Sequence, residues 1–137
     1  MMVIPESDER GRSVSLFVLM IMGALIMTAG LVIDGGQKVA AASRAEAAAA
    51  GASRAAGNAA ATLELAGVSP VAAAVTAAKD YLAGQPGVTG SVAVAGGVVT
   101  VHTSATEPTI FLAAIGIGQV TGRGSAQANL VPTGNSR

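Results

Sequence analysis

An uncharged apolar run at residues 14–33 limits what this chain can fold into more than any other feature. Its only polar side chains are Ser15 and Thr28. At 1.5 Å per residue, a helix of this length spans roughly 30 Å, the hydrocarbon thickness of a bilayer. Such a segment must be helical in a membrane, because lipid cannot satisfy unpaired backbone groups. We therefore expect a transmembrane helix at 14–33.

The residues on either side of the apolar run indicate how the helix is oriented in the membrane and whether the chain is cleaved. Arg10 and Arg12 precede it, which favours a cytoplasmic segment at 1–13 and an extracytoplasmic remainder. Lys38 and Arg44 beyond the run nearly balance these charges, so the preference is small. A cleaved signal peptide is the alternative, with small residues at 40–42 as a cleavage point. Signal peptides have shorter apolar regions of about 7–15 residues, which favours retention of a single-pass helix in the plasma membrane.

Residues 34–66 are rich in alanine, the strongest helix former, and predict a stem helix that continues from the span. Spacings of three and four residues place small or apolar residues on one stripe. A flat stripe allows helix axes to approach to the lower end of about 8–10 Å. We predict a helix-packing face toward other subunits, and a low-complexity helical spacer is the alternative. In the span and the stem, this face comprises Gly23, Met27, Gly30, Ala45, Ala49, Ala52, Ala56, Ala59 and Leu63.

Residues 67–131 predict a small extracytoplasmic αβ unit, and 132–137 a tail. Ser69 and Pro70 suit the start of a second helix, which we expect at 70–83. The period then changes to two at 91–95 and 98–105, on either side of a Gly-Gly turn, and a third strand is expected at 119–130. The apolar stretch at 110–115 is expected to plug the core, or to dip toward the membrane or a partner. The fold class is therefore α+β: a long N-terminal helix, a second helix and an antiparallel sheet of about three strands.

The composition argues against several kinds of function. Eight basic and eight acidic residues give a net charge of zero, without the basic stripe that nucleic-acid binding needs. The chain has no cysteine, and His102 is its only histidine, so the sequence offers no zinc signature. Its carboxylates are scattered singly, with no pair placed for acid–base chemistry. We expect no enzyme, no catalytic, cofactor-binding or metal site, and no small-molecule substrate.

Three stretches resemble the TadE/TadG-like pseudopilins, or minor pilins, of the tight-adherence (Flp) type IV pilus system, in their actinobacterial form. These stretches are Arg10-Gly11-Arg12-Ser-Val-Ser-Leu-Phe, Gly30-Leu-Val-Ile-Asp34-Gly35-Gly36-Gln-Lys38 and the helix that carries Arg44-Ala-Glu46 and Ser53-Arg54-Ala. The resemblance implies a type IV pilin-like fold and a membrane protein whose helix packs with those of other pilin-like subunits or assembly proteins. Some members are cut after a glycine that precedes a glutamate at the fifth mature position. Gly11 matches that glycine, but Leu16 stands where the glutamate is expected.

Two functions therefore stay open at this level. The first is a membrane-anchored structural or assembly component of a pilus or related secretion system, acting in a homo- or hetero-oligomer by helix packing. Without the glutamate, an uncleaved assembly factor is as consistent with the sequence as a fibre subunit. The second is a membrane-anchored or secreted binding module with no role in a pilus.

Overall fold

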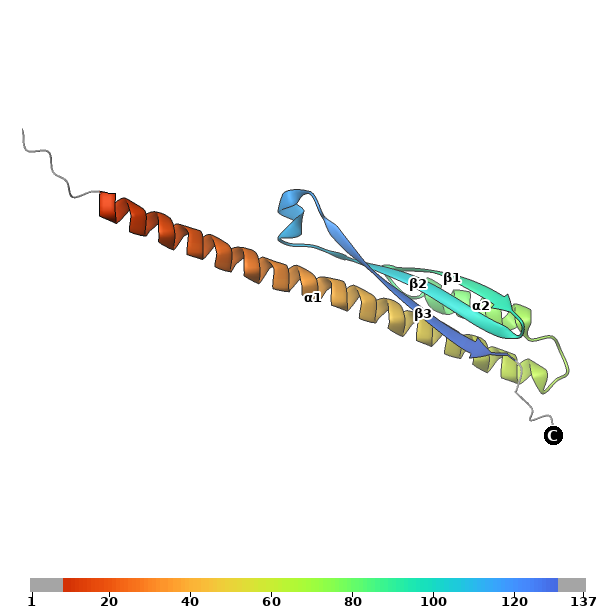
Figure 1. Ribbon diagram of the computed structural model, residues 1–137. Coiled ribbons are helices and arrows are strands. Elements are labelled where there is room, and N and C mark those ends of the chain that lie inside the picture. Colours follow the sequence, from red (N-terminus) through yellow and green to blue (C-terminus); the bar gives the residue numbers. More distant parts are fainter. Residues whose placement is uncertain (1–8, 131–137) are drawn as a thin grey trace, which may run out of the picture.

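The computed structural model describes residues 9–130 and contains one very long helix, α1, at Glu9–Glu64 (Figure 1). Its 56 residues extend over about 84 Å at 1.5 Å per residue. Gly35 and Gly36 do not interrupt it, since each costs only about 1 kcal/mol relative to alanine in a helix interior. The predicted span and stem are thus parts of a single helix. Residues 1–8 of the predicted N-terminal segment and the predicted tail lie outside the described residues.

A short turn reverses the chain into α2, at Val71–Ala83. Gly67 adopts a positive φ of 72°, and the Val68 N–H donates to the Leu63 carbonyl, which closes the end of α1. Pro70 occupies the N-cap of α2, so the helix begins at Val71, one residue later than predicted. The second helix is otherwise confirmed, and it ends at Gly84.

Three antiparallel strands follow, in the order β1-β2-β3. They are β1 at Val88–Ala95, β2 at Val98–Pro108 and β3 at Gln119–Asn129. Gly96 and Gly97, both at positive φ, form the two-residue turn of the predicted hairpin, with Ala95 paired to Val98. The prediction of three strands is confirmed, although β1 begins and β2 ends three residues beyond their predicted limits. A short 3-10 helix, η1 at Leu112–Ile115, interrupts the connection from β2 to β3.

The two helices pack against one face of the sheet, α1 mainly under β2 and β3 and α2 under β1 (Figure 1). Alternation along β2 turns Val99 and Val101 inward, and both are fully buried, while His102 is exposed. The core between the layers is made mostly of alanine, so the backbones approach closely. Its members are Ala48, Ala49, Ala52, Ala56, Ala60, Ala74, Ala78, Leu82, Val99, Val101 and Leu130.

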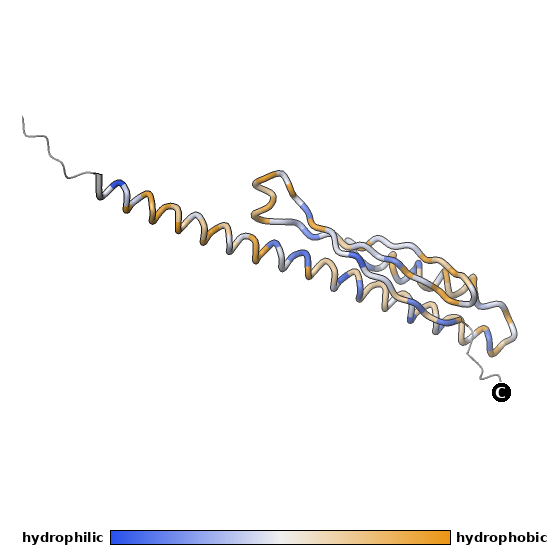
Figure 2. Tube along the Cα trace, viewed as in Figure 1, coloured by the Kyte–Doolittle hydropathy of each residue, from blue (hydrophilic) through white to orange (hydrophobic). Residues whose placement is uncertain are grey.

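The sheet covers only part of α1. The N-terminal part of the helix extends well beyond the sheet and is its most apolar stretch (Figure 2). The connection at 110–117 reaches back along α1 toward this bare part instead of entering the core, so the expectation that it plugs the core is wrong. Its large apolar residues Ile110, Phe111, Ile115 and Ile117 are exposed.

Candidate functional site

The bare part of α1 is an apolar cylinder that is long enough to cross a membrane. Its large side chains are exposed around the whole helix, so no single face is turned toward the rest of the chain. A surface of this kind requires either lipid or other apolar helices around it. The exposed side chains are those of Val14, Leu16, Phe17, Val18, Leu19, Met20, Ile21, Met22, Leu25, Ile26, Met27, Leu31, Val32 and Ile33.

Asp34 ends this cylinder and holds the 110–117 connection against it. Its carboxylate is 1% exposed and accepts hydrogen bonds from three consecutive backbone N–H groups. The Ile110 N–H donates to Oδ1 at 2.8 Å, and the Phe111 and Leu112 N–H groups donate to Oδ2 at 3.1 and 2.6 Å. The first turn of η1 would otherwise leave these donors unpaired. One carboxylate therefore fixes the connection to α1 across 76 residues of sequence.

Two opposing effects act on the pKa of Asp34. Desolvation of the carboxyl group raises the pKa, and the hydrogen bonds from Ile110, Leu112 and Phe111 lower it. The hydrogen bonds prevail, so the pKa lies below its ordinary value of 3.8. Asp34 is therefore ionised at neutral pH, and its negative charge faces the N-terminus of η1.

Gly30 is the second point of contact between α1 and the connection. The ring of Phe111 lies directly on Gly30, where an added Cβ atom would be 2.6 Å from Phe111 Cγ. Only glycine permits this approach, because any side chain would displace the ring. Gly30 and Asp34 lie one helical turn apart on the same side of α1. Together they place the tip of the connection beside the C-terminal end of the apolar cylinder.

Further contacts hold the sheet in register with α1. A Cβ atom at Gly122 would lie 2.0 Å from the Ala42 nitrogen, and one at Gly124 would lie 2.4 Å from the Glu46 nitrogen. The buried Thr103 hydroxyl donates to the Ala45 carbonyl at 2.6 Å. Arg44 and Glu107 form an ion pair at the end of β2 that is nearer the cylinder. Since both of its side chains are partly exposed, that ion pair contributes little to stability.

The predicted helix-packing face divides into two parts. Ala45, Ala49, Ala52 and Ala56 are fully buried by the chain's own sheet and α2, and Ala59 and Leu63 are partly buried. The tight packing expected of the alanine stripe is thus made within the chain, and these four alanines are not accessible to a second subunit. Gly30 is likewise covered by Phe111. Of the nine residues, only Gly23 and Met27 are exposed.

The remaining sequence candidates lie apart from one another. Gly11, the position that matches the processing glycine, is the third residue of α1 and has no atom within 4 Å of an added Cβ. Leu16 is exposed one and a half turns further on. His102 lies on the outer face of β2, close to Arg123 and Glu46 at a shallow surface hollow. Within residues 9–130, no three histidine, cysteine or acidic side chains are grouped so that they could hold a metal ion.

The sequence analysis did not predict the role of Asp34. In the sequence, Asp34 is only the acidic residue that follows the apolar run. Two signals pointed to it: a single acid at the boundary of a 20-residue apolar segment, and a second apolar stretch directly after the strand-ending Pro108. Neither signal indicates that Asp34 pairs with a segment that lies 76 residues further along the chain. A comparison of the chain with protein-family models, curated proteins and solved structures found no match.

Proposed function

We propose that this protein is a single-pass, pilin-like structural or assembly component of a tight-adherence pilus or a related secretion system. In this proposal α1 crosses the plasma membrane at 14–33 with its N-terminus in the cytoplasm, and the αβ unit lies outside. The protein acts by packing its helix against those of other pilin-like subunits or assembly proteins. The role is mechanical and requires no cofactor or substrate.

One observation carries the proposal: a single helix has two halves with different surroundings. From Gly30 to Ala60 one side of α1 is covered by the connection at 110–117, the chain's own sheet and α2. From Val14 to Ala29 the helix is apolar apart from Ser15 and Thr28, and all of these residues are exposed. A helix much shorter than about 84 Å would be enough to anchor a small domain in a membrane. A rigid rod that joins membrane and domain without a hinge suits a subunit that is positioned by its neighbours.

The exposed half offers one side for close helix contact. Gly23 and Met27 continue the line of Gly30 and Asp34 along α1, at spacings of four and three residues. Gly23 has no atom within 4 Å of an added Cβ, so another helix can approach its backbone. The connection at 110–117 occupies the same side from Gly30 onward. A neighbouring helix on this side is therefore confined to the part of α1 before Gly30.

Cysteine cross-linking tests this proposal cleanly, because the chain has no native cysteine. Met27→Cys places a thiol on the side of Gly23, and Leu25→Cys is the matched control. The two positions lie about 200° apart around the helix, and both side chains are exposed. Each variant is expressed in cells that contain the other pilus components, and membranes are then treated with a mild oxidant or a short bis-maleimide.

We expect Met27→Cys to form covalent adducts with a second helix and Leu25→Cys to form few. Identification of the adducts by mass spectrometry would show whether the partner is a second copy or another subunit. If neither variant forms an adduct, the protein does not pack laterally. In that case the membrane-anchored binding module is the better account.

A further inference from the structure

The connection at 110–117 exposes a concentrated apolar surface, of which only Phe111 packs on α1. The side chains of Ile110, Phe111, Ile115 and Ile117 are 61%, 40%, 73% and 47% exposed. A small sheet protein has no structural need for four large apolar side chains at one loop tip. We call this surface, Ile110 with Phe111, Ile115 and Ile117, the apolar tip.

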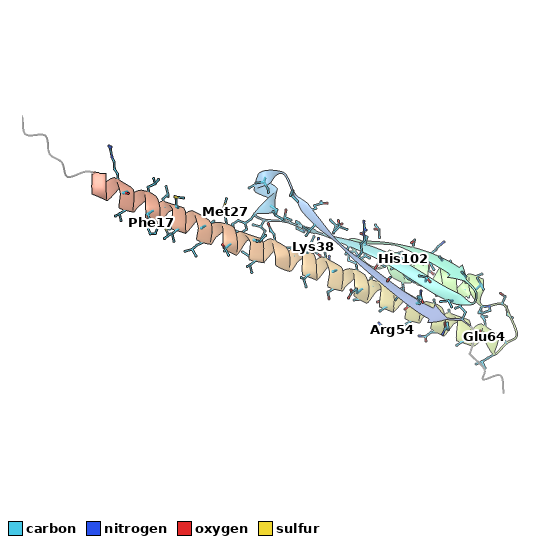
Figure 3. The ribbon with its side chains drawn as sticks, viewed as in Figure 1. Phe17, Met27, Lys38, Arg54, Glu64 and His102 are labelled. Atoms are coloured by element: carbon cyan, nitrogen blue, oxygen red, sulfur yellow. The ribbon has the colours of Figure 1, made fainter. Side chains whose placement is uncertain are left out.

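The position of the apolar tip along α1 is fixed by Gly30 and Asp34. In Figure 3, η1 lies beside the stretch of α1 between the labelled Met27 and Lys38. Gly30, on which Phe111 rests, is three residues inside the end of the apolar cylinder, a depth of about 4.5 Å at the helical rise. If 14–33 spans a membrane, the apolar tip therefore lies at the outer edge of the bilayer.

The backbone of the connection is suited to such a place. Irregular backbone tolerates lipid only where its polar groups are paired within the protein. Asp34 pairs the N–H groups of residues 110–112, and the N–H groups of Ala114, Gly116 and Ile117 donate to carbonyls within the connection. Thr109 closes its base, since its N–H donates to the Gly118 carbonyl at 3.1 Å and its hydroxyl to the Ile117 carbonyl. Most N–H groups of the connection are thus paired within the protein, while its large apolar side chains are exposed.

From this geometry we infer that the apolar tip inserts into the outer leaflet of the bilayer beside its own transmembrane helix. The occupant of this surface is lipid, because the tip is continuous with the apolar cylinder at the level where the cylinder leaves the membrane. The tip and α1 then form two adjacent points of attachment, which fix how far the sheet stands from the membrane. This inference rests on the proposed membrane span.

Tryptophan fluorescence tests the inference, because the chain contains no native tryptophan. Ile115→Trp places the probe at the apolar tip, Leu19→Trp places it in the span, and Gln127→Trp places it on β3 at the far end of the sheet. All three positions are exposed. The full chain of each variant is reconstituted in phosphatidylcholine vesicles, with and without lipids brominated on the acyl chain near the headgroup.

Interfacial segments lie about 5–10 Å into the headgroup–acyl boundary, so we expect I115W to be quenched at least about half as strongly as L19W. Emission of I115W should also be shifted to the blue, and Q127W should be neither shifted nor quenched. If L19W is quenched and I115W behaves like Q127W, the membrane span stands and the inference is overturned. A blue shift of I115W without quenching by brominated lipid would also overturn it, since protein rather than lipid would cover the tip. Absence of quenching in L19W itself would refute the span and the inference together.

Discussion

Asp34 lies where the covered and the bare parts of α1 meet, and it illustrates how one polar side chain can determine the position of a distant loop. A carboxylate at the edge of an apolar helix is costly unless hydrogen bonds replace its water. Three backbone N–H groups supply them, and they also hold its pKa below the ordinary value. The same bonds satisfy donors that η1 would leave unpaired. The Asp34 carboxylate and the N–H groups of residues 110–112 therefore depend on each other for their hydrogen bonds.

Replacement of Asp34 by alanine should release the connection without unfolding the sheet. We expect amide protons of residues 110–112 in the Asp34→Ala variant to exchange with solvent much faster than in the wild type. Hydrogen exchange by mass spectrometry or NMR in detergent measures this. Amides of β2 that pair with β3, such as that of Val101, serve as internal controls and should keep their protection. Unchanged exchange at 110–112 would show that Asp34 does not hold the connection.

Protonation should have the same effect as the substitution. Because the pKa is lower in the folded state, the contribution of Asp34 is complete above the ordinary pKa of 3.8 and is lost as the pH falls through the lowered value. Protection at 110–112, corrected for intrinsic exchange rates, should thus be constant from neutral pH to about pH 4 and fall in stronger acid. The Asp34→Ala variant should show no such step.

Glycines allow the helices and strands to approach one another closely, and the atoms around each glycine differ. At Gly122 an added Cβ meets helix backbone, which cannot give way. At Gly51 it meets the end of the Tyr81 side chain, which can rotate. In the sequence, Gly122 and Gly124 are only two glycines within the strand expected at 119–130. Their function depends on which helix lies under the strand, and that is not encoded locally.

Gly122→Ala should lower the free energy of unfolding by about 1–3 kcal/mol or more, because overpacking against backbone forces β3 away from α1. Thermal unfolding in detergent, followed by circular dichroism, should show a Tm several degrees lower. Gly118→Ala is the matched control, since an added Cβ there meets no atom within 4 Å. Equal Tm values for the two variants would contradict the close contact between β3 and α1.

At the scale of elements, periodicity in the sequence was sufficient for most of the fold. Alanine content and spacing predicted the stem. The period of two at 98–105 places Val99 and Val101 on one face of the strand, and the structure shows that this face is buried. The sequence could not reveal what covers the alanine stripe. A flat apolar stripe is equally suited to another subunit and to the chain's own sheet. Only the length and placement of the sheet decide between them, and those are tertiary properties.

Substitution within the stripe should therefore affect the fold of the αβ unit rather than assembly alone. Ala52→Leu adds bulk at a fully buried position, which should destabilise the unit by about 1–3 kcal/mol. The same change at Ala47, which is exposed on the opposite side of α1, should have little effect. Thermal unfolding of both variants measures the difference. An unchanged Tm for Ala52→Leu would imply that the stripe is not packed as described.

For the whole molecule, the sequence predicted the order of elements but not their arrangement along α1. The sheet covers the C-terminal half of the helix, the connection at 110–117 reaches to Gly30, and the remainder is bare (Figures 1 and 2). Periodic patterns describe one element at a time, so they left open whether the apolar stretch at 110–115 enters the core or lies beside the end of the apolar cylinder. Of the predicted helix-packing face, only Gly23 and Met27 are exposed, and lateral packing through them stays a prediction.

The most direct test of the account is the topology of α1 in the membrane of intact cells. Ser13→Cys lies just before the apolar cylinder, and Gln127→Cys lies on the exposed side of β3. With a maleimide that cannot cross membranes, Gln127→Cys should react in intact cells and Ser13→Cys only after permeabilisation, while both proteins stay in the membrane fraction. Labelling of Ser13→Cys in intact cells, or recovery of a soluble chain without residues 14–33, would contradict the account.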